Sequence, residues 1–336
     1  MIAQVSAGGA EWEIDLDHPV TLAIETRFVE SGFAEPGFPT TGPTAFGAPR
    51  ASSQPLVVSG FNGSVAAGAS CNCRTITLTP HCNATHVECV GHLTAQPFDV
   101  IRVVPPGLVP AALLTIAPEL AGDDDLPITA SLLKSRWRQL ESPRQSPPLS
   151  SSLSPSASPR AVVIRTLPNE ESKRHRDYTC GAAPYLTPDA ARWLVEHGIE
   201  HLIVDTPSID RMADGGRLAA HRTFFGLPPG ATDLALAARP HCTITELAYV
   251  PDSVADGEYL LQLQVPALAG DAVPARPLLY AAVHTGRRSG HEQRRGGGEQ
   301  DRGDHERGGG RQEDRRDGDE GRGEREQDRG GRDVAS

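Results

Sequence analysis

The sequence predicts a mixed α/β fold built around one mixed sheet. Up to about residue 140, short runs of β-branched and other apolar residues are broken by Gly and Pro, which is typical of strands joined by turns. From residue 161 the pattern changes to strand, helix, strand, a unit that usually connects two parallel strands. With 336 residues, 38% of them hydrophobic, the chain can bury one large core. We therefore expect a single domain at 1–285.

The first part of the chain is expected to form an antiparallel meander. Its strands are predicted at 20–24, 56–58, 74–79 and 99–104. A Ser/Pro-rich stretch follows at about 142–160, and it contains too little apolar surface to order itself. We interpret this stretch as a surface insertion or a linker.

The second part supplies the parallel strands. One strand is predicted at 161–165 and a buried one at 201–205, with a helix between them. Thr187 and Pro188 provide an N-cap and a proline at the first helical position, and Gly198 ends the helix. Late strands are predicted at 260–265 and 277–281.

The last segment, 286–336, consists almost wholly of Arg, Asp, Glu, Gln and Gly, and we expect it to be a disordered tail. Arg-Gly segments can bind RNA, but here acids alternate with the arginines and no Phe, Tyr or Trp is present to stack on bases. An RNA-associated protein is therefore a minor alternative. It predicts RNA binding that disappears when the chain is cut near Gly286.

Charge and hydropathy limit the partners. A net charge of −11 argues against a general binder of nucleic acid or of anionic membranes, because gripping phosphates depends on clustered Lys and Arg. No run approaches the roughly 18 apolar residues that span a bilayer, and no export signal is evident. We expect a cytoplasmic protein with no nucleic-acid and no membrane partner, whose six cysteines are reduced.

One short segment has the composition of a metal site. Residues 80–92 contain three histidines, two cysteines and one carboxylate, the ligand types that bind zinc or manganese. His86 and Glu88 would share one face of an extended strand. Cys82 is either a ligand or a small buried hydrophobe. His81 is the alternative to it, although on a strand it would point the other way.

This segment resembles the metal motif of the cyclase family that includes kynurenine formamidase and isatin hydrolase, His-x-Gly-Thr-His-x-Asp-x-x-x-His. Aligned on Thr85 and His86, Glu88 takes the Asp position and His92 the last His. Two positions depart from the motif, because Ala84 stands for the Gly and Cys82 for the first His.

The resemblance continues along the chain and implies roles for later residues. Its segments are 14–16, 45–49, 184–188, 202–210, 220–222 and 243–247. In the family, a His and a Glu from the later segments reach the metal centre, and here they fall on His221 and Glu246. Phe46 lies in a loop near the substrate pocket.

Further roles are expected around these ligands. His92 is the general base or proton shuttle. Thr85 and Asp205 are expected to support the ligands, with Asp205 orienting His221 or capping a turn. Asp210 and Arg211 are interpreted as a surface ion pair.

The resemblance implies a single mixed-sheet domain of the cyclase/formamidase type that forms homo-oligomers. It also implies an arylformamidase-like enzyme with one or two divalent ions, Zn or Mn, in which metal-bound hydroxide attacks the carbonyl of a small amide such as N-formylkynurenine. The alternative is a non-catalytic metal-binding protein on the same fold, which Ala84 and Cys82 favour.

Overall fold

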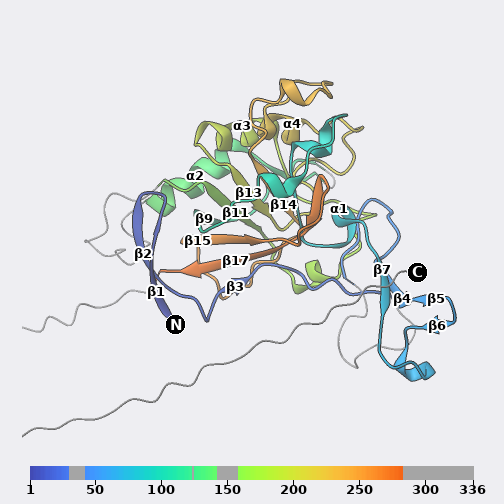
Figure 1. The fold of residues 1–336 in the computed structure, drawn as a ribbon. Coiled ribbons are helices and arrows are strands. Elements are labelled where there is room, and N and C mark those ends of the chain that lie inside the picture. Colours follow the sequence, from blue (N-terminus) through green and yellow to red (C-terminus); the bar gives the residue numbers. More distant parts are fainter. Residues whose placement is uncertain (30–41, 123–124, 142–157, 283–336) are drawn as a thin grey trace, which may run out of the picture. The chain divides into compact units, whose positions relative to one another are not determined.

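The computed structural model describes residues 1–29, 42–122, 125–141 and 158–282, and its centre is a mixed sheet (Figure 1). The nine strands of this sheet in the described residues run in the order β16-β8-β14-β13-β11-β9-β15-β17-β3. In chain order they are β3 (Val20–Thr21), β8 (His86–Glu88), β9 (Val109–Ile116), β11 (Ala161–Thr166), β13 (His201–Val204), β14 (Thr243–Glu246), β15 (Gly257–Gln264), β16 (Ala272–Pro274) and β17 (Arg276–Ala281).

The middle of the sheet is parallel and both of its ends are antiparallel. β9, β11, β13 and β14 pair in parallel, whereas β8 and β16 on one side and β15, β17 and β3 on the other pair antiparallel. Every residue of β11 and β13 is buried, as expected for parallel strands covered on both faces. The predicted strand–helix–strand unit and the mixed α/β class are confirmed.

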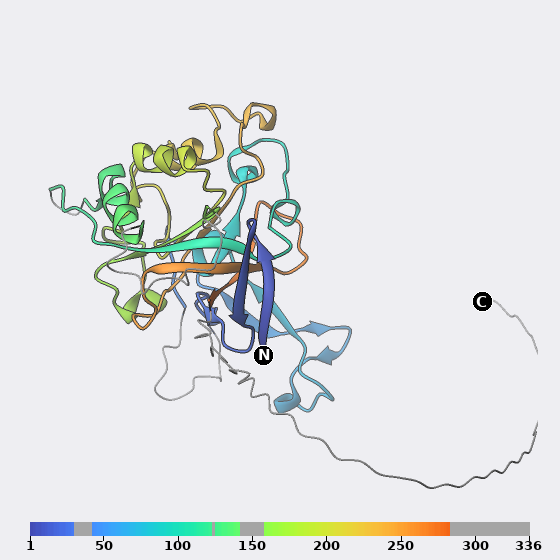
Figure 2. The same ribbon diagram turned by 90° about the vertical axis from the view of Figure 1, so that its left-hand side faces the viewer.

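Three helices cover one face of the sheet (Figures 1 and 2). They are α2 (Ala130–Glu141), α3 (Pro188–Glu196) and α4 (Ala219–Phe225), and α1 (Pro80–Asn83) is a single turn near the edge strand β16. Leu133, Trp193 and Phe224 from the three covering helices share one buried cluster with Ile164 and Val204 of the sheet. The 3₁₀ turns are Val65–Ala67, Val90–Leu93, Val100–Arg102, Glu171–Arg174 and Leu234–Leu236.

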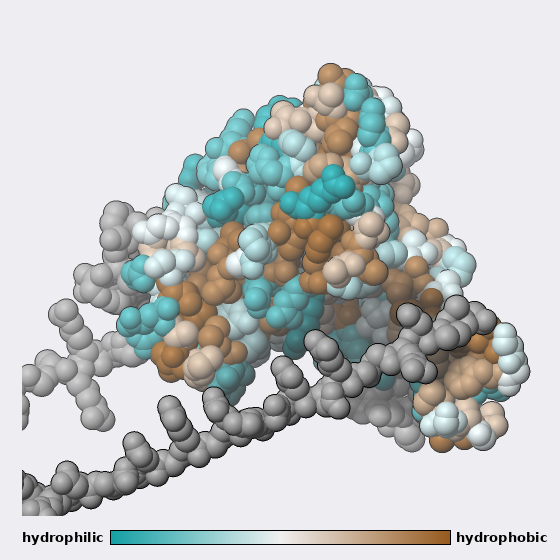
Figure 3. All heavy atoms as spheres, viewed as in Figure 1, coloured by the Kyte–Doolittle hydropathy of each residue, from teal (hydrophilic) through white to brown (hydrophobic). Residues whose placement is uncertain are grey.

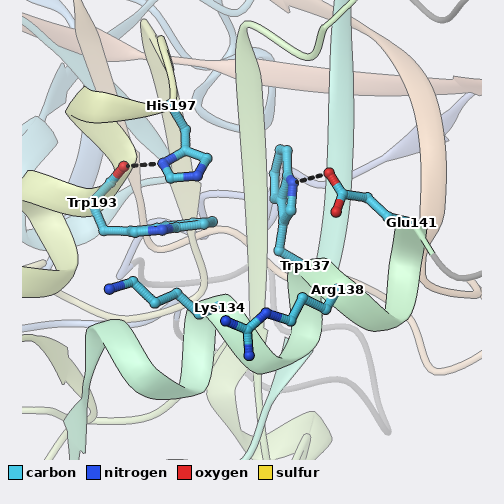
Figure 4. A pocket seen from close by; sticks show the side chains of 6 residues that line it. All are labelled: Lys134, Trp137, Arg138, Glu141, Trp193 and His197. Atoms are coloured by element: carbon cyan, nitrogen blue, oxygen red, sulfur yellow. Dashed lines mark hydrogen bonds between the residues drawn. The ribbon is translucent and has the colours of Figure 1, made fainter.

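Aromatic contacts lock α2 against α3 (Figure 4). The rings of Trp137 and Trp193 meet edge to face with centroids 5.6 Å apart, a favoured geometry for aromatic pairs. His197 lies with its ring 3.9 Å from that of Trp193 and donates from Nδ1 to the Trp193 carbonyl at 2.8 Å. Trp137 Nε1 donates to Glu141 at 2.8 Å, so one polar atom of each of Trp137 and His197 has a hydrogen-bond partner.

Smaller pairs of strands lie outside the main sheet. They are β1 (Ile2–Ala7) with β2 (Ala10–Asp15), β4 (Ser52–Pro55) with β7 (Arg74–Thr77), β5 (Val57–Val58) with β6 (Phe61–Asn62), and the parallel pair β10 (Pro127–Ile128) with β12 (Tyr185–Leu186). Residues 52–77 form what we call the β4–β7 arm. Figure 3 shows apolar side chains over this arm, and Val57, Val58, Val65 and Ile76 are 49–71% exposed.

Two sequence-based expectations about strands are wrong. Residues 99–104 contain the 3₁₀ turn Val100–Arg102, because Asp99 Oδ1 accepts the Gly270 N–H at 3.0 Å and curls the segment in spite of its β-branched residues. The simple meander is also wrong, because β8 pairs with β14 and β16 from the far end of the chain. Residues 142–157 of the Ser/Pro stretch and the tail at 286–336 lie outside the described residues. Within the described ranges, no helix is long and apolar enough to cross a bilayer.

Candidate metal centre

β8, the strand next to the edge strand β16, carries His86 and Glu88 on one face, as the sequence predicts. They are the first and last residues of β8, and their side chains are fully buried on the same face. Val87 between them points to the opposite side, into an apolar cluster. The antiparallel register places Glu246 of β14 directly across from His86. A three-residue strand therefore brings two predicted ligands next to a third.

His221 completes this group from α4. Its Nε2 lies 2.9 Å from Glu88 Oε1 and 3.4 Å from Glu246 Oε1. His86 Nε2 lies 3.6 Å from Glu246 Oε2 and 3.7 Å from Glu88 Oε2. The ligand atoms of Glu88, His221 and Glu246 all lie within 4.8 Å of one another, and all three residues are buried. Four predicted ligands thus converge, although they are up to 160 positions apart (246 − 86).

Four inward-facing atoms of this group have no hydrogen-bond partner. His86 Nε2, His221 Nε2 and both carboxylate oxygens of Glu88 are buried and make no hydrogen bond. His221 Nε2 and Glu88 Oε1 lie 2.9 Å apart, yet neither atom makes a hydrogen bond. Buried polar atoms without partners are costly. A divalent cation would satisfy them, and imidazole and carboxylate are suitable donors for zinc or manganese.

The outward-facing nitrogens of both imidazoles are satisfied. His86 Nδ1 donates to the Ala84 carbonyl at 3.0 Å. His221 Nδ1 donates to Asp210 Oδ2 at 2.6 Å. Such bonds fix the tautomer and orientation of metal-binding histidines. Both rings therefore hold Nε2 toward the centre before any ion arrives.

Glu88 and His221 shift each other's pKa values toward the charged forms. Burial opposes ionisation of Glu88, but the charges of His221 and His92 outweigh it and hold the pKa of this carboxyl well below its usual range. Burial likewise opposes protonation of His221, but the Glu88 carboxylate raises the pKa of this imidazole well above its ordinary value. A metal-binding imidazole must be neutral, so cation binding here would compete with protonation of His221.

The structure distinguishes the two candidates for the first ligand. His81 Nδ1 lies 2.9 Å from Glu88 Oε2, and His81, His86 and Glu88 form a second group of ligand atoms within 4.8 Å. Cys82 lines the same cavity but joins none of the ligand groups in the described part of the chain. The expectation that His81 points away from the ligand side assumed that residues 81 and 82 lie on a strand. Because α1 is a helical turn, neighbouring side chains are about 100° apart.

A cavity of about 390 Å³ opens next to the ligands. Phe46 lines it together with His92, Ser208 and Leu218, and its contact with a substrate stays a prediction. Phe46 and Leu218 both have positive φ, at 57° and 47°, a region that side-chain-bearing residues rarely adopt. Such backbone strain gathers at functional sites.

His92 stands at the edge of this cavity. It belongs to the turn Val90–Leu93, its side chain is 28% exposed, and its ring centroid lies 4.2 Å from that of His81 and 5.8 Å from that of His221. A histidine beside the ligands but open to solvent can exchange protons with the medium. Its role as general base stays a prediction.

Of the two residues expected to support the ligands, Thr85 lies beside them and Asp205 does not. Thr85 Oγ1 donates to the Leu247 carbonyl and accepts the Ile24 N–H at 2.8 Å, so it ties the start of β8 to the residue after Glu246. Asp205 does not contact His221. It accepts from the Thr166 N–H and from Lys173 Nζ, both at 2.8 Å, and stabilises a buried ion pair elsewhere.

Asp210 holds His221 instead, so its interpretation as a surface ion pair with Arg211 is wrong. Asp210 is 6% exposed, and besides the His221 ring it accepts the Ala220 N–H at 2.7 Å. Arg211 pairs with Asp125 at 3.3 Å. The only sequence signal for Asp210 would have been a carboxylate ahead of a helix, and eight residues lie between it and the start of α4.

Sequence reasoning also missed Asp271. Its Oδ2 lies 2.9 Å from His81 Nε2 and 3.4 Å from His92 Nδ1. Its own segment carries no motif, and 190 positions separate it from His81. Nothing in the sequence pattern indicates the contact.

Comparisons with known proteins point to one family. The Cyclase family model, described as "Putative cyclase", matches residues 14–211. A predicted metal-dependent hydrolase from Bacillus stearothermophilus is 16% identical, with 78% of this chain and 98% of that chain covered and a TM-score of 0.46. Isatin hydrolase A from Ralstonia solanacearum is 13% identical, with 78% and 91% covered and a TM-score of 0.46.

A third solved structure, an isatin hydrolase bound to the product analogue thioisatinate, is 18% identical, with 77% and 88% covered and a TM-score of 0.42. A comparison with curated proteins finds no match. At these identities the likeness carries no information about the reaction.

Proposed function

Because the chain belongs to the cyclase family, we propose that it is a metal-dependent hydrolase that cleaves a small amide. The observation that carries this proposal is the set of buried donor atoms without partners, on His86, Glu88 and His221, at the wall of a cavity. An apolar core would not place such atoms face to face, since each costs free energy when unsatisfied.

The ligand set fits one or two zinc or manganese ions. His81, His86 and Glu88 would hold one ion, and Glu88, His221 and Glu246 a second, with Glu88 shared. When bound, such ions acidify water and polarise a carbonyl oxygen. His92 accepts a proton at the cavity edge and returns it to the leaving nitrogen. Asp210 keeps His221 in one tautomer throughout.

The shape of the cavity favours a small, partly apolar substrate. Its volume of about 390 Å³ suits a molecule of the size of an aromatic amide. Phe46 and Leu218 offer apolar surface, and Ser208 offers one hydroxyl. An aryl formamide such as N-formylkynurenine, or a cyclic amide, meets these limits.

We also propose that the protein self-associates through the β4–β7 arm. A two-stranded arm is marginally stable by itself, and this one exposes Val57, Val58, Val65 and Ile76. Exposed apolar patches usually mark contact surfaces. A second copy of the chain is the partner that the family resemblance implies.

The hydrolase proposal is tested by metal content and turnover on the same samples. The full chain is purified, its metal is measured by plasma mass spectrometry, and hydrolysis is followed over a panel of formamides, cyclic amides and esters. We expect metal and turnover in the parent, and loss of both in His86→Ala. His241→Ala, which removes an exposed histidine, is the matched control. Bound metal without turnover on any substrate would favour the non-catalytic metal-binding protein.

A further inference from the structure

One carboxylate holds two histidines at the mouth of the metal centre. Asp271 directly precedes β16, and its Oδ2 accepts from His81 Nε2 at 2.9 Å and lies 3.4 Å from His92 Nδ1. The two imidazole rings are tilted by 32° with centroids 4.2 Å apart. Both rings therefore face the same oxygen of one residue.

Two backbone features allow Asp271 to lie close to His81 and His92. The Asp271 carbonyl accepts the Cys89 N–H at 3.0 Å, which fixes the segment beside β8. A side chain at Gly91 would come within 2.3 Å of the Phe98 carbonyl oxygen and 3.2 Å of Asp271 Cβ. Gly91 thus permits the turn that carries His92 to pack against the segment that carries Asp271.

Each ring nitrogen of His81 faces a carboxylate. Nε2 donates to Asp271, which leaves the lone pair of Nδ1 facing Glu88 at 2.9 Å and the ligand group that contains His86. A carboxylate that accepts the outer N–H of an imidazole fixes the tautomer and raises the basicity of the inner nitrogen. This is the arrangement that a metal-binding histidine requires.

Cys82 has no comparable arrangement. Its thiol lines the same cavity but belongs to no group of ligand atoms among the described residues.

We propose that the first ligand of the metal centre is His81, acting through Nδ1, and that Asp271 is the positioning residue that holds both His81 and His92. The inference rests on the proposed metal centre and adds to it a residue outside the family motif. It explains how the chain can carry Cys82 at the motif's first position: the ligand has moved by one residue, and a carboxylate from the far end of the chain orients it.

Cobalt(II) is the probe that tests this assignment, because a thiolate ligand adds a charge-transfer absorption in the near ultraviolet that imidazole and carboxylate do not. We expect the cobalt-loaded full chain to lack this absorption, and Cys82→Ser to leave both the spectrum and the cobalt affinity unchanged. His81→Ala should change the ligand-field spectrum and weaken binding.

Competition with a chelator then tests Asp271. Asp271→Asn should lower cobalt affinity by about 10- to 100-fold, the usual effect of removing the carboxylate behind a metal-binding histidine. Asp252→Asn, at a residue bonded to Asn169, is the matched control and should change nothing. Circular dichroism of each variant shows that the fold is retained.

Three results would overturn the proposal: a thiolate absorption that vanishes in Cys82→Ser, unchanged affinity in Asp271→Asn, or unchanged affinity in His81→Ala. Absence of cobalt binding in the parent would overturn the proposed metal centre as well. Cobalt bound as expected without hydrolysis of any amide would overturn the hydrolase alone, and the ligand assignment would stand.

Discussion

Asp210 acts on the metal centre through another residue. It is buried, and its Oδ2 accepts from His221 Nδ1 at 2.6 Å. Asp210→Asn keeps the shape but removes the charge behind the imidazole, so we expect metal affinity to fall by about 10- to 100-fold while the fold is retained. Chelator competition measures the affinity. Asp233→Asn, which alters a carboxylate at the 3₁₀ turn Leu234–Leu236, is the control. Equal affinity in both variants would show that His221 does not bind the metal.

His92 should separate binding from turnover. Its ring lies at the cavity edge, outside the buried pair His86 and Glu88. His92→Ala should keep the metal content of the parent and lower kcat by about 10²- to 10⁴-fold, the usual contribution of a general acid or base. Metal analysis and kinetics on one preparation measure both. If the variant loses its metal, His92 is a ligand and the assignment of the proton transfer is wrong.

Residue spacing explains which parts of the site could be predicted. His86 and Glu88 lie two positions apart on one strand, so the period of a strand alone places them together. His221 and Glu246 could be named only through the family resemblance. Asp210 and Asp271 could not be found, because their contacts depend on how α4 and β16 pack against β8, which no local pattern records.

At the scale of elements, β13 carries a buried histidine outside the metal centre. His201, its first residue, is 3% exposed and its Nδ1 contacts Thr243 Oγ1 at 2.9 Å. Burial lowers the pKa of His201 to about 4 from 6.5. Below pH 6.5 the unfolded chain takes up a proton that the folded chain refuses. Stability is therefore full above about pH 6.5 and is lost as the pH falls toward 4.

His201→Asn should remove this pH dependence, since an amide can replace Nδ1 but does not titrate. We expect the free energy of unfolding of the parent to fall by up to about 3 kcal/mol more than that of the variant between pH 7 and pH 4, at about 1.4 kcal/mol per pKa unit. Urea denaturation of metal-free protein measures it, so that metal release plays no part. Parallel curves for parent and variant would contradict the pKa, and exposed His175→Ala is the control.

Elements with local signals were predictable and those defined by distant partners were not. α3 begins at Pro188 and ends before Gly198, whose φ is +72°, as capping rules indicate. β9, the longest strand of the parallel core, escaped prediction because Pro110 and two alanines weaken its strand signal. It exists because β11 and β15 pair with it on either side.

At the scale of the whole molecule, the β4–β7 arm makes self-association testable. Charges on the arm should oppose its contact with a second copy, so we expect the double variant Val57→Asp/Ile76→Asp to have a lower molar mass in solution. Light scattering after size exclusion measures the mass. Ile101→Asp, at a residue that is 41% exposed outside the arm, is the control. An unchanged mass in the double variant would place the contact elsewhere or show that the chain is a monomer.

The metal centre joins segments that are distant in sequence, so metal should stabilise the whole fold. Glu88 on β8, His221 on α4 and Glu246 on β14 bring buried ligand groups together, and the inward-facing atoms of Glu88 and His221 make no hydrogen bond. A ligand that binds only the folded state adds about 2.7 kcal/mol when its free concentration is about 100 times Kd. For a domain of this size that raises Tm by about 5–10 °C.

Removal of metal with a chelator should therefore lower Tm by about this amount, and zinc or manganese should restore it. Scanning calorimetry of the full chain, with and without chelator, measures the shift. His86→Ala is the decisive control, because it lacks a ligand from β8 and its Tm should not respond to added metal. If the parent is equally stable in chelator, the buried carboxylates Glu88 and Glu246 are balanced by protonated His86 and His221 alone, and the cluster is an ion-pair network instead of a metal centre.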